Sequence, residues 1–139
     1  MSVVVFVYGT LKRGKSNNIL MRGSEYLGIG MTQEKYVMYE AGIPYVSDKF
    51  KLTNIVGELY KVDRHTLKAL DNLEGHPIWY KRKEIEVDFL EDHIAKFNKE
   101  NIKPITAWLY FNDDAPVNAE VNETGIYQAK RSQINSLMN

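Results

Sequence analysis

The sequence of 139 residues contains no cysteine and no excess of charge of either sign. The lack of cysteine excludes disulfides, thiolate catalysis and cysteine-ligated zinc or iron–sulfur sites. Lysine plus arginine and aspartate plus glutamate each number 18, so the formal net charge is zero. A neutral chain argues against binding nucleic acid or an anionic membrane through bulk charge. Histidine is also scarce: His65, His76 and His93 are too widely spaced for a local metal motif, so no metal site is expected.

Long apolar runs are missing as well. No stretch approaches the roughly 18 apolar residues that a membrane-spanning helix needs. The first apolar run, residues 3–8, has no lysine or arginine before it and stops at Gly9, so it does not fit a secretory signal peptide. We therefore expect a soluble protein of the cytoplasm with no membrane or nucleic-acid partner. The length predicts a single domain over residues 1–139.

Short β-branched and aromatic runs predict several strands. Residues 3–8 are apolar on both faces, which suits a strand buried in the middle of a sheet or barrel. Further strands are expected at residues 35–40, 54–62, 80–89 and 105–111, and glycines at positions 23, 28 and 30 punctuate the stretch before the first of these. Residues 18–21 are expected to form one helical turn capped by Asn17 or Asn18. An extra helix is predicted at residues 91–101, followed after residue 112 by a mostly extended tail that wraps back onto the domain.

A helix over residues 63–74 carries the first candidate for chemistry. Asp63 suits the N-cap, Gly75 suits the position after the last turn, and Pro77 prevents continuation. Leucines at positions 67, 70 and 73 make an apolar stripe, and Glu74 follows Leu70 by four residues, which places it on the same face. Burial there and the negative end of the helix dipole both disfavour the ionised carboxylate, so its pKa is predicted to be raised. Such a carboxyl suits a general acid/base, unless Glu74 lies at a frayed helix end and reaches water.

The loop after the first strand is the second candidate. Tyr8, Gly9, Thr10 and Leu11 end the strand in a glycine turn, which exposes successive backbone N–H groups. Such groups can bind a carboxylate or a developing oxyanion without a charged side chain. The basic pair Lys12–Arg13 is expected to add positive charge nearby. The alternative is a plain β-turn.

The same loop also matches the bare phosphate-loop string G-x-x-x-x-G-K-S at residues 9–16. A true phosphate loop opens a long helix inside a parallel α/β sheet. Here a glycine at position 23 interrupts the following stretch within about two turns, and no βαβ repeat follows, so nucleotide binding is a minor alternative. Trp79, Tyr80, Trp108 and Tyr110 are predicted to form core and pocket wall rather than a stacking platform for bases, because the net charge is zero.

Two segments together are far more specific than either alone. Residues 5–14, VFVYGTLKRG, and residues 70–82, in which LDNLEGHP is followed by WYKR, resemble two signatures of the gamma-glutamylcyclotransferase-like superfamily. Between them, VGELYKV at residues 56–62 is similar to the family's G-E-hydrophobic-Y strand, and AWLY at residues 107–110 is similar to its last core strand. The resemblance covers a core of residues 3–111 in the same order, and it is strongest to the gamma-glutamylaminecyclotransferase and AIG2-like branch.

The resemblance implies an α+β fold, a small mixed β-barrel with flanking short helices, and a pocket at one barrel end. Members of this family convert a γ-glutamyl amide or amine into 5-oxoproline and a free amine without a metal or organic cofactor, so no cofactor is expected. Glu74 would be the catalytic acid/base. Substrate would be bound, largely through the backbone of the glycine loop, by Tyr8, Gly9, Thr10, Leu11 and Tyr80.

Two departures from the family leave the leaving amine unidentified. Residues 90–101 are longer than the usual hairpin between the last two core strands, and the tail of residues 112–139 does not match. Two functions therefore stay open. The first is a cyclotransferase that acts on a small γ-glutamyl substrate as a monomer or weak dimer. The second is a non-catalytic AIG2-like module that binds a small metabolite or a protein. Glu74 favours the first, because a binding module needs no carboxylate on an apolar face.

Overall fold

The computed structural model describes residues 2–91 and 103–128. This part of the chain contains seven strands, one α-helix and one turn of 3₁₀ helix. In chain order they are β1 (Ser2–Val7), the 3₁₀ turn η1 (Asn18–Met21), β2 (Glu25–Glu40), β3 (Pro44–Ser47), β4 (Thr53–Asp63), α1 (Arg64–Glu74), β5 (Lys81–Glu91), β6 (Ile105–Phe111) and β7 (Glu120–Asn122).

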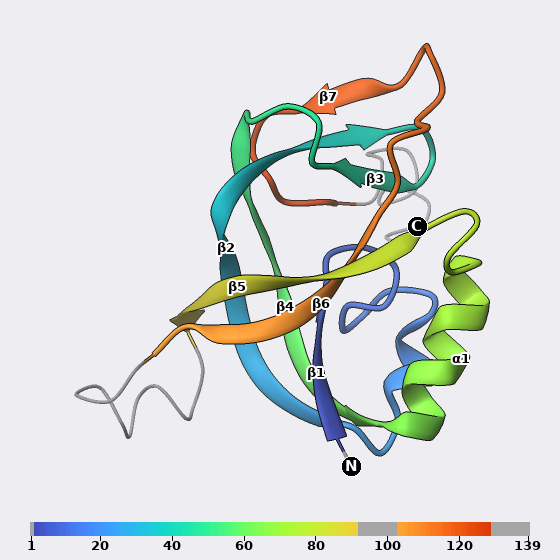
Figure 1. The fold of residues 1–139 in the computed structure, drawn as a ribbon, viewed down its shortest axis with the longest axis vertical. Helices are drawn as coiled ribbons and strands as arrows, with labels where there is room; N and C mark the ends of the chain where they lie inside the picture. The colour runs from blue at the N-terminus through green and yellow to red at the C-terminus, as the bar shows by residue number, and fades with distance from the viewer. Residues whose placement is uncertain (1, 92–102, 129–139) are drawn as a thin grey trace, which may run out of the picture.

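Five of the strands close into a barrel in the order β2-β4-β1-β6-β5, because β5 pairs back onto β2. The β1–β6 pair is parallel, with Val5 opposite Trp108, and the other pairs are antiparallel. Closure leaves no free edge among these five strands. β3 and β7 pair with the far part of β2 and extend the sheet beyond the barrel (Figure 1). The small mixed barrel of the α+β class is therefore confirmed.

The first strand shows how alternate side chains serve two cores. Phe6 is fully buried inside the barrel, whereas Val5 and Val7 face the opposite way into a second apolar cluster. That second cluster also contains Leu70 of α1 and Met21 of η1, so it joins the outer face of the barrel to the helices. Side chains alternate across a strand, and both faces of β1 are covered, which explains its uninterrupted apolar sequence.

The helix α1 begins and ends where its capping residues predict. The side chain of Asp63 accepts a hydrogen bond from the Thr66 amide at 2.7 Å. Gly75 adopts a left-handed conformation with φ of 65°, and such a conformation favours glycine. Leu70 is fully buried against the barrel, but Leu73 is 38% exposed. The apolar stripe therefore reaches the protein surface at the C-terminal end of the helix, beside Glu74.

The segment after β6 wraps back onto the barrel, as expected for its described part. β7 pairs with β2, where Met38 lies opposite Asn122. Tyr127 is buried, and its hydroxyl donates to the Gly42 carbonyl at 3.3 Å. Glu91 is the last residue of β5, and residues 92–101 of the helix predicted at 91–101 lie outside the described residues. No helix in the described part of the chain is long and apolar enough to cross a membrane.

Candidate active site

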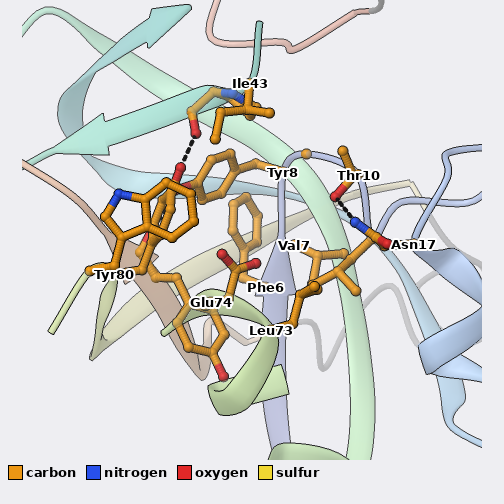
Figure 2. Close-up of a pocket in the computed structure, with 14 residues that line it drawn as sticks. Phe6, Val7, Tyr8, Thr10, Asn17, Ile43, Leu73, Glu74 and Tyr80 are labelled. Carbon is orange, nitrogen blue, oxygen red and sulfur yellow. Dashed lines mark hydrogen bonds between the residues drawn. The ribbon is translucent and has the colours of Figure 1, made fainter. Parts of the chain in front are cut away.

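Glu74 is the last residue of α1, and its side chain is only partly exposed. Figure 2 shows its carboxylate extending from the helix end into a space bounded by Phe6, Tyr8 and Tyr80. Within the described part of the chain, no hydrogen bond or ion pair reaches this carboxylate. Burial without a polar partner disfavours the charged form and raises the pKa of Glu74 from 4.5 to about 7.

The space is a cavity of about 220 Å³ at one end of the barrel. Glu74 and Tyr80 line it on the side of α1, and the four residues of the glycine loop, Tyr8–Leu11, line it on the side of β1. Pro44, the first residue of β3, contributes a further wall. The structure thus brings all six residues that the sequence analysis assigned to the site into one cavity: Tyr8, Gly9, Thr10, Leu11, Glu74 and Tyr80.

The glycine loop presents three unpaired backbone amides. Among the hydrogen bonds of the described residues, none uses the N–H group of Gly9, Thr10 or Leu11. The carbonyls of the same residues are all occupied: Gly9 accepts from the Lys12 amide, Thr10 from the Asn17 amide and Leu11 from an asparagine side chain. A backbone segment with filled acceptors and free donors is suited to binding an anionic oxygen.

Three tyrosines surround the carboxylate, but their hydroxyl protons are directed elsewhere. Tyr8 donates to the Tyr110 carbonyl at 2.7 Å, and Tyr80 donates to the Pro44 carbonyl at 2.8 Å. Tyr110, which also lines the cavity, donates to an Asp71 carboxylate oxygen at 2.7 Å. Burial raises the pKa of each of these three phenols, so they remain protonated near neutral pH. Within the described part of the chain, Glu74 is therefore the one group lining the cavity that can gain or lose a proton near pH 7.

Tyr80 reaches the cavity through the turn that follows the helix. The amides of Ile78 and Trp79 donate to the Gly75 carbonyl, and the Tyr80 amide donates to the Glu74 carbonyl at 3.1 Å. These bonds fold the chain back, so Tyr80 lies next to Glu74 before β5 begins. Trp79 also lines the cavity and is 49% exposed at its mouth, in agreement with its predicted place in a pocket wall.

The basic pair Lys12–Arg13 directly follows the glycine loop but does not line the cavity. The Lys12 ammonium donates to the Tyr127 carbonyl at 2.9 Å, and the Arg13 guanidinium lies 3.9 Å from Glu58 and stacks over the ring of Tyr26. Both side chains are held by partners that are distant in the sequence. Among the residues that the structure describes, no lysine, arginine or histidine lines the cavity.

The helical turn predicted at residues 18–21 is present as η1, with Asn17 at its N-cap position and Asn18 as its first residue, but neither asparagine side chain caps the turn. The Asn17 side chain donates to the Thr10 hydroxyl at 2.8 Å, and the Asn18 side chain donates to the Leu11 carbonyl at 2.8 Å. Asn17 also lines the cavity, and its hydrogen bond to Thr10 fixes the position of the glycine loop. Pro44 is a second lining residue that the sequence did not reveal. It is far along the chain from both candidate segments, so no local pattern connects it with the site.

The phosphate-loop alternative does not fit the structure. The residues after Ser16 form a single 3₁₀ turn, Asn18–Met21, where a phosphate loop requires a long helix. β1 pairs antiparallel with β4 and parallel only with β6, which is not its neighbour in the sequence. For metals, the described ranges 2–91 and 103–128 hold no group of three histidine, aspartate or glutamate side chains that could bind an ion.

Comparison with known proteins shows the family to which this chain is similar. The family described as gamma-glutamyl cyclotransferase, AIG2-like, matches residues 5–129. A protein of Methanocaldococcus jannaschii with the provisional name gamma-glutamylcyclotransferase is 46% identical over 108 residues, which are 77% of this chain and 82% of the relative. The human protein named gamma-glutamylaminecyclotransferase is 38% identical over 98 residues, which are 64% of this chain and 64% of the relative.

The fold has a close counterpart among solved structures. The crystal structure of an AIG2-like protein from Mus musculus superimposes with a TM-score of 0.74 and 27% identity, covering 94% of this chain and 97% of that chain. The match over residues 5–129, the 46% identity and the shared barrel lead to one conclusion. The chain belongs to the gamma-glutamyl cyclotransferase, AIG2-like, family of enzymes.

Proposed function

We propose that this protein is a cyclotransferase that converts a γ-glutamyl amine or γ-glutamyl peptide into 5-oxoproline and a free amine. The names of its relatives support the reaction class. The observation that carries the proposal is the position of Glu74, a half-buried carboxyl with a pKa of about 7 that lines the same cavity as three unpaired loop amides.

The first chemical step needs a base. The α-amine of the substrate is the nucleophile, and it must lose a proton before its lone pair can attack the γ-carbonyl carbon. The ionised Glu74 carboxylate takes this proton, and its raised pKa makes the transfer more favourable than it would be for an ordinary glutamate. The attack closes a five-membered ring, so the two reacting atoms already belong to one molecule and their proximity is built into the substrate.

The second requirement is stabilisation of negative charge. As the new C–N bond forms, the electron pair of the γ-carbonyl moves onto its oxygen. The N–H groups of Gly9, Thr10 and Leu11, which no other group of the described residues binds, can donate to that oxyanion or to the substrate's carboxylate. The tetrahedral intermediate then re-forms the carbonyl, the bond to the leaving nitrogen breaks, and Glu74 gives its proton to that nitrogen, which departs as a neutral amine. The ring nitrogen still carries two protons after the attack, and the regenerated Glu74 carboxylate takes one of them and passes it to the free amine. The products are then 5-oxoproline with one proton on its ring nitrogen, the protonated amine and the ionised Glu74 carboxylate.

The remaining lining residues shape the substrate site. In this proposal Tyr8, Gly9, Thr10 and Leu11 bind substrate mainly through their backbone, and Tyr80 forms a wall against it. No cationic side chain lines the cavity among residues 2–91 and 103–128, so in this proposal an anionic group of the substrate binds to backbone N–H groups. All the steps above use groups of the substrate and of this chain.

The proposal is tested by mass-spectrometric detection of 5-oxoproline from a panel of γ-glutamyl amines and γ-glutamyl peptides. We expect the wild type to release 5-oxoproline from at least one member, and Glu74→Gln to be about 10²–10⁴-fold slower, because it cannot move the proton. Glu84→Gln is the matched control, since Glu84 is an exposed glutamate of β5 away from the cavity, and it should keep full activity. Binding of 5-oxoproline without any turnover would instead indicate the non-catalytic module.

A further inference from the structure

The loop that lines the cavity is held in place from its outer side. Arg13, just after the loop, donates its backbone amide to the Glu58 carboxylate at 2.8 Å. The same oxygen of Glu58 accepts a hydrogen bond from the Tyr60 hydroxyl at 3.1 Å. Both acceptor and donor belong to β4, which pairs with β1 so that Glu58 lies opposite Val7, the last residue before the loop. The side chains of Glu58 and Tyr60 therefore hold the end of the loop against β4, and neither side chain lines the cavity.

A continuous chain of hydrogen bonds runs along this outer side. The Asn18 side chain donates to the Leu11 carbonyl at 2.8 Å and approaches the Tyr60 hydroxyl at 3.3 Å. Tyr60 in turn donates to Glu58, which accepts from the Arg13 amide. Burial is the main cause that raises the pKa of Tyr60 to about 12, so this phenol keeps the proton that it donates. Glu58 itself has only 13% of its side chain exposed, so its carboxylate is a largely enclosed acceptor at the end of the chain.

The orientation of the loop carbonyls determines the orientation of its amides. In a planar trans peptide the C=O and N–H groups point in opposite directions. The Gly9 carbonyl faces the Lys12 amide, so the N–H of Thr10 points away from it; the Thr10 carbonyl faces Asn17, so the N–H of Leu11 points away from that side. Asn18 binds the Leu11 carbonyl, and the peptide of that carbonyl carries the Lys12 N–H that donates to Gly9. Glu58 binds the amide of the next peptide, that of Arg13, so these contacts fix the end of the turn that orients the Gly9 carbonyl and, with it, the Thr10 N–H.

We propose that Glu58 is a positioning residue, which acts with Tyr60 and Asn18 to hold the loop so that the amides of Thr10 and Leu11 face the reacting oxygen. This inference rests on the proposed function and deepens it. Glu58 touches no substrate in this role. It acts only through the loop backbone, and a small displacement of that backbone weakens every hydrogen bond that the amides make to the developing charge.

The kinetic test compares Glu58→Ala with Glu58→Gln, because glutamine keeps an oxygen that can accept from Arg13 and Tyr60. We expect Glu58→Ala to lower kcat by about ten- to a hundredfold, with a smaller rise in KM and an unchanged midpoint of the pH profile. Glu58→Gln should recover most of this loss. Glu84→Ala is the control, because Glu84 is a strand glutamate that does not contact the loop, and its kcat and KM should match those of the wild type. If folded Glu58→Ala keeps the wild-type kcat, or if Glu58→Gln is as slow as Glu58→Ala, the positioning role is wrong.

A second measurement does not depend on catalysis. In ¹H–¹⁵N spectra, the amide signals of Thr10 and Leu11 should move in Glu58→Ala. They should also move in Asn18→Asp, because the aspartate has no N–H group to donate to the Leu11 carbonyl. The same signals should stay close to their wild-type positions in Glu58→Gln. Unmoved signals in both disruptive variants would overturn the inference. A wild type that releases no 5-oxoproline would refute the proposed function alone, and the amide signals would still decide whether Glu58 orients the loop.

Discussion

Replacing Glu74 by glutamine should stabilise the folded protein at pH 8, although it removes the residue assigned to catalysis. The folded state holds this carboxyl with a pKa of about 7, whereas its ordinary value is 4.5. A carboxyl whose pKa is raised on folding supports stability below its unfolded pKa, and that contribution is lost as the pH rises through the folded pKa. The wild type should therefore lose stability between pH 4.5 and about 7 through Glu74.

The size of the effect follows from the same two values. The difference between 4.5 and about 7 is about 2.5 pH units, and each unit corresponds to about 1.4 kcal/mol, so ionisation of Glu74 reduces the free energy of unfolding by about 3 kcal/mol. Glutamine is neutral at every pH and carries no such penalty. Other titrating groups are common to both proteins and cancel in their difference.

Urea unfolding of the two proteins at several pH values between 4 and 8 measures this difference. The free energy of unfolding of Glu74→Gln minus that of the wild type should be smallest near pH 4, increase through pH 4.5–7 and level off about 3 kcal/mol higher. A difference that does not change with pH would show that the Glu74 carboxyl has an ordinary pKa in the folded state. The proposed basis of its reactivity would then be wrong.

Three further substitutions test the walls of the cavity. Gly9→Ala would place a Cβ atom 2.9 Å from the Pro44 side chain, so it should lower the free energy of unfolding in urea by about 1–3 kcal/mol and slow the release of 5-oxoproline. Unchanged kinetics would contradict the close contact between Gly9 and Pro44. Tyr80→Phe loses one hydrogen bond to the Pro44 carbonyl and should cost about 1–3 kcal/mol while most turnover remains; a loss of turnover comparable to that of Glu74→Gln would make the phenol a proton donor. Asp71→Ala leaves the Tyr110 hydroxyl without its acceptor and should raise KM, which steady-state kinetics would reveal, whereas an unaltered KM would show that Tyr110 needs no anchor.

Short-range signals in the sequence were sufficient for the helix and for the face that Glu74 occupies. Asp63 caps the first turn and Gly75 ends the last one, and both effects depend on backbone groups within a few residues. The helical spacing between Leu70 and Glu74 then predicted a partly buried carboxylate, and burial is the cause of its raised pKa. The prediction succeeded because each of these contacts is local or follows from periodicity.

The long strand β2 shows that a glycine in the sequence does not always mark the end of a strand. Glycines at positions 28 and 30 indicated interruptions, yet β2 continues through both, from Glu25 to Glu40. A Cβ atom at Gly30 would lie 2.6 Å from the Val87 side chain inside the barrel, so glycine is required there by packing against β5 rather than by a turn. That contact arises from closure of the barrel and has no trace in the local pattern.

The outer side of the loop was not predictable for the same reason. Asn17 and Asn18 stand at the start of a helical turn, where asparagine is typical of capping residues, but their side chains bind Thr10 and Leu11 seven residues earlier. Glu58 contacts Arg13 across 45 residues of chain. Such contacts depend on which strands become neighbours. The sequence therefore revealed the groups that face the cavity more readily than the groups that hold them.

The dependence of kcat/KM on pH between 5 and 8 tests most directly whether the buried carboxyl of Glu74 is the working base. With a substrate whose own groups do not titrate in this range, kcat/KM should fall about tenfold for each pH unit below a midpoint near 7, since only the ionised carboxylate can accept the proton. A profile that stays flat from pH 7 down to pH 5 would contradict the assignment of Glu74.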